Sequence, residues 1–131
     1  MNLRQKRKMQ VKTKKLINSF KYAGEGIISS FKSERNMKIH IFIMLTVILA
    51  GILLELIAIE WIICVLLFAI VISAELFNTA LETIVDMVSP EKNENAKIAK
   101  DVSAGAVLVV AIGAAIVGLV IFVPKVIELF I

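Results

Sequence analysis

The chain contains one cysteine, two prolines, one tryptophan and one tyrosine among its 131 residues. A single cysteine cannot form an intramolecular disulfide or supply a zinc cluster, and Cys64 lies within an apolar run, where cysteine usually serves as a packing residue. The phosphate-binding motif G-x-x-x-x-G-K-[ST] is absent, and "GEGIIS" at 24–29 is an incomplete glycine-rich loop with no strand before it. A soluble-type nucleotide-binding fold is therefore excluded.

Charge is scarce as well: charged residues make up 20% of the chain, hydrophobic residues make up 59%, and the mean hydropathy is +0.88. A soluble domain of this size has an apolar fraction nearer one half. The longest uncharged runs are 39–54, 61–74 and 102–123. Because a spanning helix needs about 20 mainly apolar residues, the sequence predicts an all-α integral membrane protein with spans at about 36–55, 60–88 and 95–123.

Positive charge is concentrated near the N-terminus, where 11 of the 15 Lys and Arg residues lie within the first 38 positions. A basic segment next to a span is typical of the cytoplasmic side, and we prefer this interpretation to nucleic-acid binding. The turn at 55–60 has no Lys or Arg, whereas "SPEKNENAKIAKD" at 89–101 contains three lysines. We therefore expect a bacterial cell-membrane protein with its N-terminus in the cytoplasm and its C-terminus outside.

The segment before the first span has two parts. Residues 1–14 are charged and aperiodic, which predicts a basic, flexible tail. From residue 15 apolar side chains recur at helical spacing, which predicts an amphipathic helix at about 15–33 lying in the membrane interface. Pro90 ends the second span, and Asn93 or Asn95 can cap the next helix. Residues 15–131 are expected to form a single membrane-embedded domain.

The stretch "AELFNTALETIVDMV" at 74–88 places polar side chains at the end of a membrane helix. If Trp61 marks the outer edge of a hydrocarbon layer about 30 Å thick, a rise of about 1.5 Å per residue puts Glu75 about 21 Å deep and Glu82 at the inner boundary. Four polar residues fall within roughly 80° of one helix face: Glu75, Asn78, Glu82 and Asp86. Since ionisable groups are expensive near hydrocarbon, this face predicts a functional site.

Simpler interpretations stay open for some of these residues. Asp86 is explained as well by solvation of an emerging helix as by function. Glu34 precedes the first span at a depth similar to that of Glu82, which favours convergence of the two carboxylates. Glu75 is the deepest and has no cation nearby in the sequence, which favours a general base. A lone interfacial histidine such as His40 is more often a helix-end hydrogen-bonding residue than a catalyst.

Three blocks, "FKSERNMKIH" (31–40), "AELFNTALETIVD" (74–86) and "AKIAKDVSAGAVL" (96–108), make the chain resemble the small prokaryotic diacylglycerol kinase family. That family includes the undecaprenol kinases of Gram-positive bacteria. The resemblance covers about 15–124. It implies an N-terminal surface helix, three spans, a homotrimer with sites between subunits, and ATP- and Mg-dependent phosphorylation of a membrane lipid alcohol.

The resemblance also assigns roles to individual residues. Glu75 is the implied catalytic carboxylate that takes the proton from the lipid hydroxyl, and Asn78 supports it. Glu34 and Glu82 are the implied ligands of Mg with ATP. Further positions are expected on the nucleotide side: Lys15, Tyr22, Glu91, Lys92, Asn93, Lys100 and Asp101.

The chain departs from the family pattern at Asn93, where relatives often have His, and at Ser103 with Ala104. "ERNMKIH", "AGAVL" and "IFVPK" (121–125) favour undecaprenol as the substrate, with diacylglycerol as the alternative. Two other classes are weighed against a kinase. A small oligomeric transporter would use Glu75 to bind ions but should place it nearer the bilayer centre, and a noncatalytic membrane adaptor has no use for the acidic face.

Overall fold

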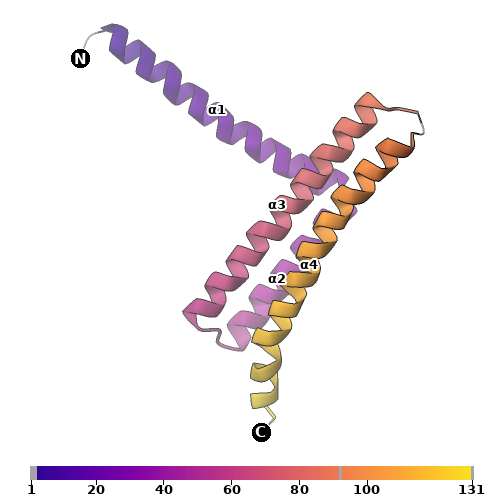
Figure 1. Ribbon diagram of the computed structural model, residues 1–131. Coiled ribbons are helices and arrows are strands. Elements are labelled where there is room, and N and C mark those ends of the chain that lie inside the picture. Colours follow the sequence, from indigo (N-terminus) through magenta and orange to yellow (C-terminus); the bar gives the residue numbers. More distant parts are fainter. Residues whose placement is uncertain (1–2, 92, 131) are drawn as a thin grey trace. The chain divides into compact units, whose positions relative to one another are not determined.

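The computed structural model describes residues 3–91 and 93–130, and they form four helices joined by short connections. The helices are α1 (Leu3–Ser33), α2 (Arg35–Leu53), α3 (Ala58–Val88) and α4 (Glu94–Glu128) (Figure 1). The chain divides after Ser33 into two compact units, α1 and the bundle of α2, α3 and α4. Each unit is described by itself.

Helix α1 begins well before the predicted surface helix and includes residues 3–14. This stretch contains no proline or glycine and is rich in good helix formers such as Lys, Arg and Gln. Two hydroxyl groups donate hydrogen bonds to backbone carbonyls four residues earlier in the helix. Thr13 Oγ1 donates to the Met9 carbonyl and Ser19 Oγ donates to the Lys15 carbonyl, both at 3.0 Å. The division into a tail at 1–14 and a membrane domain stays a prediction.

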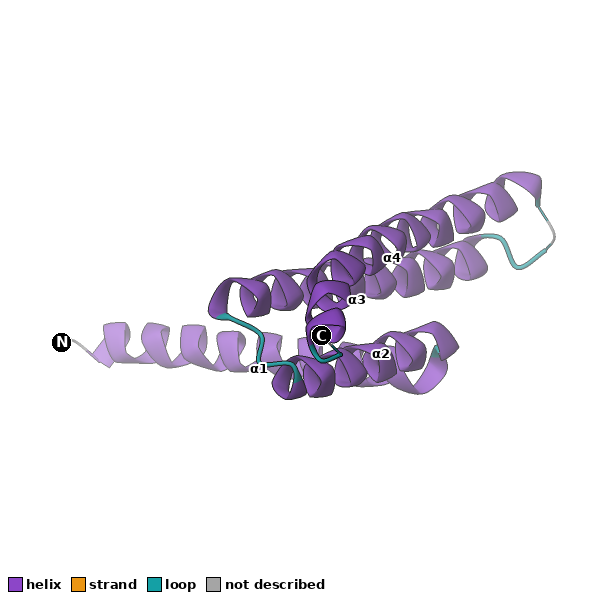
Figure 2. Cartoon of the chain, turned by 90° about the horizontal axis from the view of Figure 1, so that it is seen from below, coloured by secondary structure: helices purple, strands orange, loops and turns teal. Residues whose placement is uncertain are grey.

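Helices α2, α3 and α4 are each long and apolar enough to cross a membrane. The prediction of an all-α protein with three such helices is confirmed. Helix α4 runs alongside α3, and α2 also packs on α3 (Figures 1 and 2). The α2–α3 loop and the end of α4 lie at one end of the bundle, and the α3–α4 loop lies at the other (Figure 1).

Local interactions set the helix ends. The backbone N–H of Ile57 donates to Glu60 Oε2 at 2.8 Å at the start of α3. Helix α3 ends at Val88, two residues before Pro90, as expected because proline disfavours the helical conformation in the residue before it. Asn93 caps α4 by accepting bonds from the N–H groups of Asn95 and Ala96 at 2.9 and 3.3 Å.

Helix α4 continues through Pro124 to Glu128, beyond the predicted end of the span at 123. Lys125 Nζ lies 3.1 Å from Glu60 Oε2, and each side chain is only 20% exposed. This ion pair ties the last turns of α4 to the beginning of α3. The helix persists past Pro124, although an interior proline removes one backbone hydrogen bond.

A small apolar cluster holds the same end of the bundle together. Leu56, Cys64 and Ile121 are buried there, and Trp61 packs against them. Gly51 permits a close approach, because a Cβ at this position would lie 2.8 Å from Cη2 of Trp61. Few other apolar side chains of the described chain are buried, so most of the apolar surface of these helices is left for lipid or other subunits.

Candidate active site

Glu75 is the most unusual side chain of the bundle. It lies within α3, is 1% exposed, and neither carboxylate oxygen has a hydrogen-bond partner among the described residues. Its neighbour is His40 of α2, whose Nε2 lies 4.0 Å from Glu75 Oε2. A buried carboxylate without hydrogen bonds destabilises the fold. Such a group is expected where a protein needs it for binding or chemistry.

About two helical turns beyond Glu75 on α3, Glu82 is held by a chain of hydrogen bonds that begins at Asn78. Asn78 is buried, and its Nδ2 donates to Glu82 Oε1 at 3.1 Å. The Asn78 Oδ1 accepts a hydrogen bond from Ser103 Oγ of α4. Ser103 therefore sets the orientation of the Asn78 amide, and the amide in turn orients the Glu82 carboxylate. We did not predict Ser103 as a site residue, because this contact depends on how α3 and α4 are rotated against each other.

A groove of about 310 Å³ opens beside Glu75 and is lined by all three helices of the bundle. Its polar lining residues are Asn36, His40, Glu75 and Asn78. Its apolar lining residues are Ile39, Ala104, Val107, Leu108 and Ala111. A groove that is apolar over most of its wall, with a few polar groups that include one carboxylate, suits a largely apolar ligand with a polar reactive group.

The third carboxylate predicted to converge here is Glu34. It is the half-buried residue before α2, and its side chain does not cap that helix. The charges of Glu34 and Glu82 both act on Glu75. The convergence of the Glu34 and Glu82 carboxylates on one site stays a prediction.

These residues fit a magnesium ion that is shared with a nucleotide. In the part of the chain that the structure describes, no three His, Cys, Asp or Glu side chains come together as a metal cage. Mg²⁺ rarely uses such a cage, because it is usually held by one or two carboxylates together with substrate phosphates and water. Glu34 and Glu82 are carboxylates of the chemistry that such a site would use, and both influence the charge of Glu75.

Two ion pairs lie toward the α3–α4 loop. Lys100 Nζ lies 2.9 and 3.1 Å from the two carboxylate oxygens of Asp86, which joins α4 to α3. Lys97 pairs with Asp101 one turn apart on α4. Both pairs are substantially exposed, so each is weak and easily exchanged for another partner. Asp86 is therefore an exposed residue with a cationic partner on α4.

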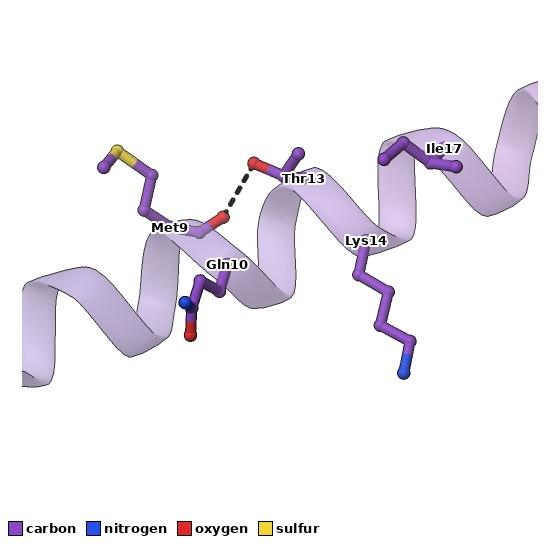
Figure 3. Close-up of a pocket in the computed structure, with 5 residues that line it drawn as sticks. All are labelled: Met9, Gln10, Thr13, Lys14 and Ile17. Atoms are coloured by element: carbon purple, nitrogen blue, oxygen red, sulfur yellow. Dashed lines mark hydrogen bonds between the residues drawn. The ribbon is translucent and has the colours of Figure 1, made fainter.

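The cavity on α1 is of a different kind. Met9, Gln10, Thr13, Lys14 and Ile17 border a space of about 340 Å³, and all five side chains come from successive turns of one helix (Figure 3). With walls from a single helix, this space cannot enclose a ligand. We assign it no site.

Comparison with known proteins identifies the family to which a chain with this groove and these carboxylates belongs. Residues 21–122 match the family described as prokaryotic diacylglycerol kinase. The chain belongs to the prokaryotic diacylglycerol kinase family. The resemblance found in the sequence is thereby confirmed.

Three relatives illustrate the range of this family. An undecaprenol kinase of Bacillus subtilis (strain 168) is 43% identical over 111 residues, which are 85% of this chain and 90% of that protein. A diacylglycerol kinase of Synechocystis is 44% identical over 117 residues, 88% of this chain and 67% of that protein. A diacylglycerol kinase of Haemophilus influenzae is 35% identical over 94 residues, 72% of this chain and 80% of that protein.

The other nucleotide-side residues implied by the diacylglycerol kinase resemblance differ in exposure and in the element that carries them. Glu91 is exposed in the α3–α4 loop, and Asn93 is occupied as the cap of α4. Lys92 lies outside the described residues. Lys15 and Tyr22 are exposed on α1, in the other compact unit. Their roles on the nucleotide side stay predictions.

Proposed function

We propose that the protein transfers the γ-phosphate of ATP to the hydroxyl of a membrane lipid alcohol, and that the alcohol is undecaprenol. Membership of the prokaryotic diacylglycerol kinase family makes it a lipid kinase, a phosphotransferase with an alcohol acceptor. The observation that carries the chemical proposal is the buried, unpaired Glu75 carboxylate beside a largely apolar groove. The choice of undecaprenol is supported by the similarity to the Bacillus enzyme over nine-tenths of that enzyme's length.

Glu75 acts as the general base in this proposal. Phosphoryl transfer depends on positioning and on neutralising charge, so the protein has little covalent chemistry to perform. The acceptor lipid lies along Ile39, Val107 and Leu108 with its hydroxyl at Glu75. As the hydroxyl oxygen bonds to the γ-phosphorus, the bond from that phosphorus to ADP breaks and the hydroxyl proton passes to the Glu75 carboxylate.

Glu34 and Glu82 are proposed to hold magnesium with ATP. Two carboxylates repel a triphosphate, and the bound cation supplies the positive charge that lets them face it. The chain from Ser103 through Asn78 holds Glu82 ready for this role. Lys100 and Asp101 are proposed to contact the nucleotide, together with Lys15, Tyr22, Glu91, Lys92 and Asn93.

The assembly and orientation are also proposals. The exposed apolar surface of α2, α3 and α4 supports a homotrimer in which these faces meet lipid and neighbouring copies. The exposed apolar residues Leu16, Ile17 and Phe20 support α1 as an amphipathic helix on the membrane surface. The concentration of Lys and Arg in the first 38 residues supports a cytoplasmic N-terminus and an outer C-terminus.

The choice of lipid is tested by offering purified protein both alcohols in mixed micelles with Mg-ATP and measuring initial rates. We expect kcat/KM for undecaprenol to exceed that for diacylglycerol by at least about tenfold, since the apolar side chains along the groove (Ile39, Ala104, Val107, Leu108 and Ala111) offer no hydrogen-bond donor to the ester carbonyls of diacylglycerol. Equal or reversed preference would favour the alternative function, diacylglycerol kinase, which the similarity to the Synechocystis enzyme supports.

Asp86→Asn is expected to lower the KM for Mg-ATP by about two- to fivefold and to leave kcat nearly unchanged. Asp86 competes with the nucleotide for Lys100, and exposed ion pairs of this kind are weak. Initial rates against ATP concentration measure the effect. Lys100→Gln is the matched comparison and should raise the same KM. An unchanged KM in both variants would remove Lys100 from the nucleotide site.

A further inference from the structure

Glu75 has to lose a proton after every turnover, and its surroundings make this difficult. The carboxyl group is 1% exposed, and its oxygens have no hydrogen-bond partner in residues 3–91 and 93–130. A carboxyl group that keeps the proton from one lipid cannot take a proton from the next. A more exposed base beside Glu75 would give this proton a route to water.

We propose that His40 accepts this proton from Glu75 and releases it toward the open end of the groove, so that it acts as a positioning and proton-relay residue. The inference rests on the proposed role of Glu75. His40 Nε2 is 4.0 Å from Glu75 Oε2, and both residues line the same groove. The separation exceeds a hydrogen bond by about 1 Å, a gap that a small side-chain rotation closes.

Exposure increases stepwise along the proposed path. The side chain of Glu75 is 1% exposed and that of His40 is 15% exposed, and Asn36 is an exposed residue. Asn36 and His40 stand four residues apart on α2, so their side chains lie on one face of the helix, and both line the groove. A proton on His40 thus lies one helical turn from the exposed groove residue Asn36.

The proton balance of the relay is simple. The lipid O–H bond breaks as the oxygen bonds to phosphorus, and the proton moves to Glu75. The neutral imidazole then takes the proton on Nε2, which requires that Nδ1 carries the hydrogen in the resting tautomer. The imidazolium releases its proton to water and the Glu75 carboxylate is restored.

The charges around His40 suit this role. Glu75 is the ionisable group that faces it from α3, and the groove residues of α4 are Ala104, Val107, Leu108 and Ala111, all uncharged. Its neighbours in the groove from α2, Asn36 and Ile39, are uncharged too. The contact of the ring recorded among the described residues is the one with Glu75. The Glu75 carboxylate, 4.0 Å from Nε2, can therefore pair with the imidazolium.

The relay is tested with His40→Gln and His40→Ala, measured for kcat, for both KM values and across pH. Gln keeps the size and a hydrogen-bond donor but is not a base. We expect kcat to fall by about 10- to 100-fold in both variants, with KM values within about threefold of wild type. The part of the pH profile that follows His40 titration should disappear. Added imidazole should restore His40→Ala and leave Glu75→Gln inactive.

Thr46→Ala, an exposed change on the same helix, is the matched control and should have wild-type kinetics. Full activity in His40→Gln, or a loss confined to KM, would overturn the relay. His40→Gln alone carries this test if His40→Ala does not assemble. Wild-type protein that phosphorylates no lipid alcohol would instead overturn the proposed function, so the two failures are distinguishable.

Discussion

Glu75→Gln is expected to reduce the rate of lipid phosphorylation by about a thousandfold or more and, at the same time, to raise the thermal stability of the protein. The rate falls because the amide cannot accept the hydroxyl proton, and a positioned general base contributes up to about 10,000-fold. Stability rises because a neutral side chain of the same shape replaces a buried carboxylate without hydrogen bonds.

The two effects are measured on the same preparation, by lipid kinase assay and by thermal unfolding in detergent. Glu55→Gln is the matched control, because Glu55 is an exposed carboxylate in the α2–α3 loop, away from the groove. It should leave the rate unchanged. Mg-ATP binding should survive in Glu75→Gln. Wild-type turnover in Glu75→Gln would remove the proposed mechanism.

Glu82→Gln is expected to weaken the use of magnesium and ATP, with the KM for Mg-ATP rising by about 100-fold and a smaller loss of kcat. Replacing a carboxylate ligand by an amide removes the charge that holds the cation at the triphosphate. Initial rates are measured against Mg²⁺ at fixed ATP. High Mg²⁺ should restore part of the lost activity, because the defect lies in binding.

Ser103→Ala is a second variant of the same site, and a smaller effect is expected from it. It removes the hydrogen bond that holds Asn78, which in turn orients Glu82, so we expect a shift of about tenfold in the Mg²⁺ dependence. Thr83→Ala, at an exposed hydroxyl on α3, is the control. If neither Glu82→Gln nor Ser103→Ala moves the Mg²⁺ dependence, Glu82 is not a metal ligand.

Features encoded within one helix are predictable from this sequence. The apolar runs and Pro90 mark the spans, and the cap at Asn93 follows from its side chain. The continuation of α4 past Pro124 is not predictable in this way. Nor is the ion pair between Lys125 and Glu60 at this end, because the two residues are far apart in the chain and meet only when α3 and α4 pack.

In the candidate site too, features within one helix are predictable from the sequence, whereas contacts between helices are not. Helical spacing places Glu75, Asn78 and Glu82 on one face of α3. In the structure Glu75 and Asn78 line the groove, and Asn78 donates a hydrogen bond to Glu82. The partners themselves depend on helix rotation. Ser103 meets Asn78, His40 meets Glu75, and Asp86 meets Lys100, although none of these pairs has a local sequence signature.

Helix α3 contains neither glycine nor proline in its 31 residues. It is therefore a stiff rod, and the height of Glu75 relative to the helix ends is constant. With the proposed orientation, the reactive carboxylate serves only lipids whose hydroxyl lies in the cytoplasmic leaflet. An alcohol left in the opposite leaflet is beyond its reach, so transbilayer movement of the lipid has to precede its phosphorylation.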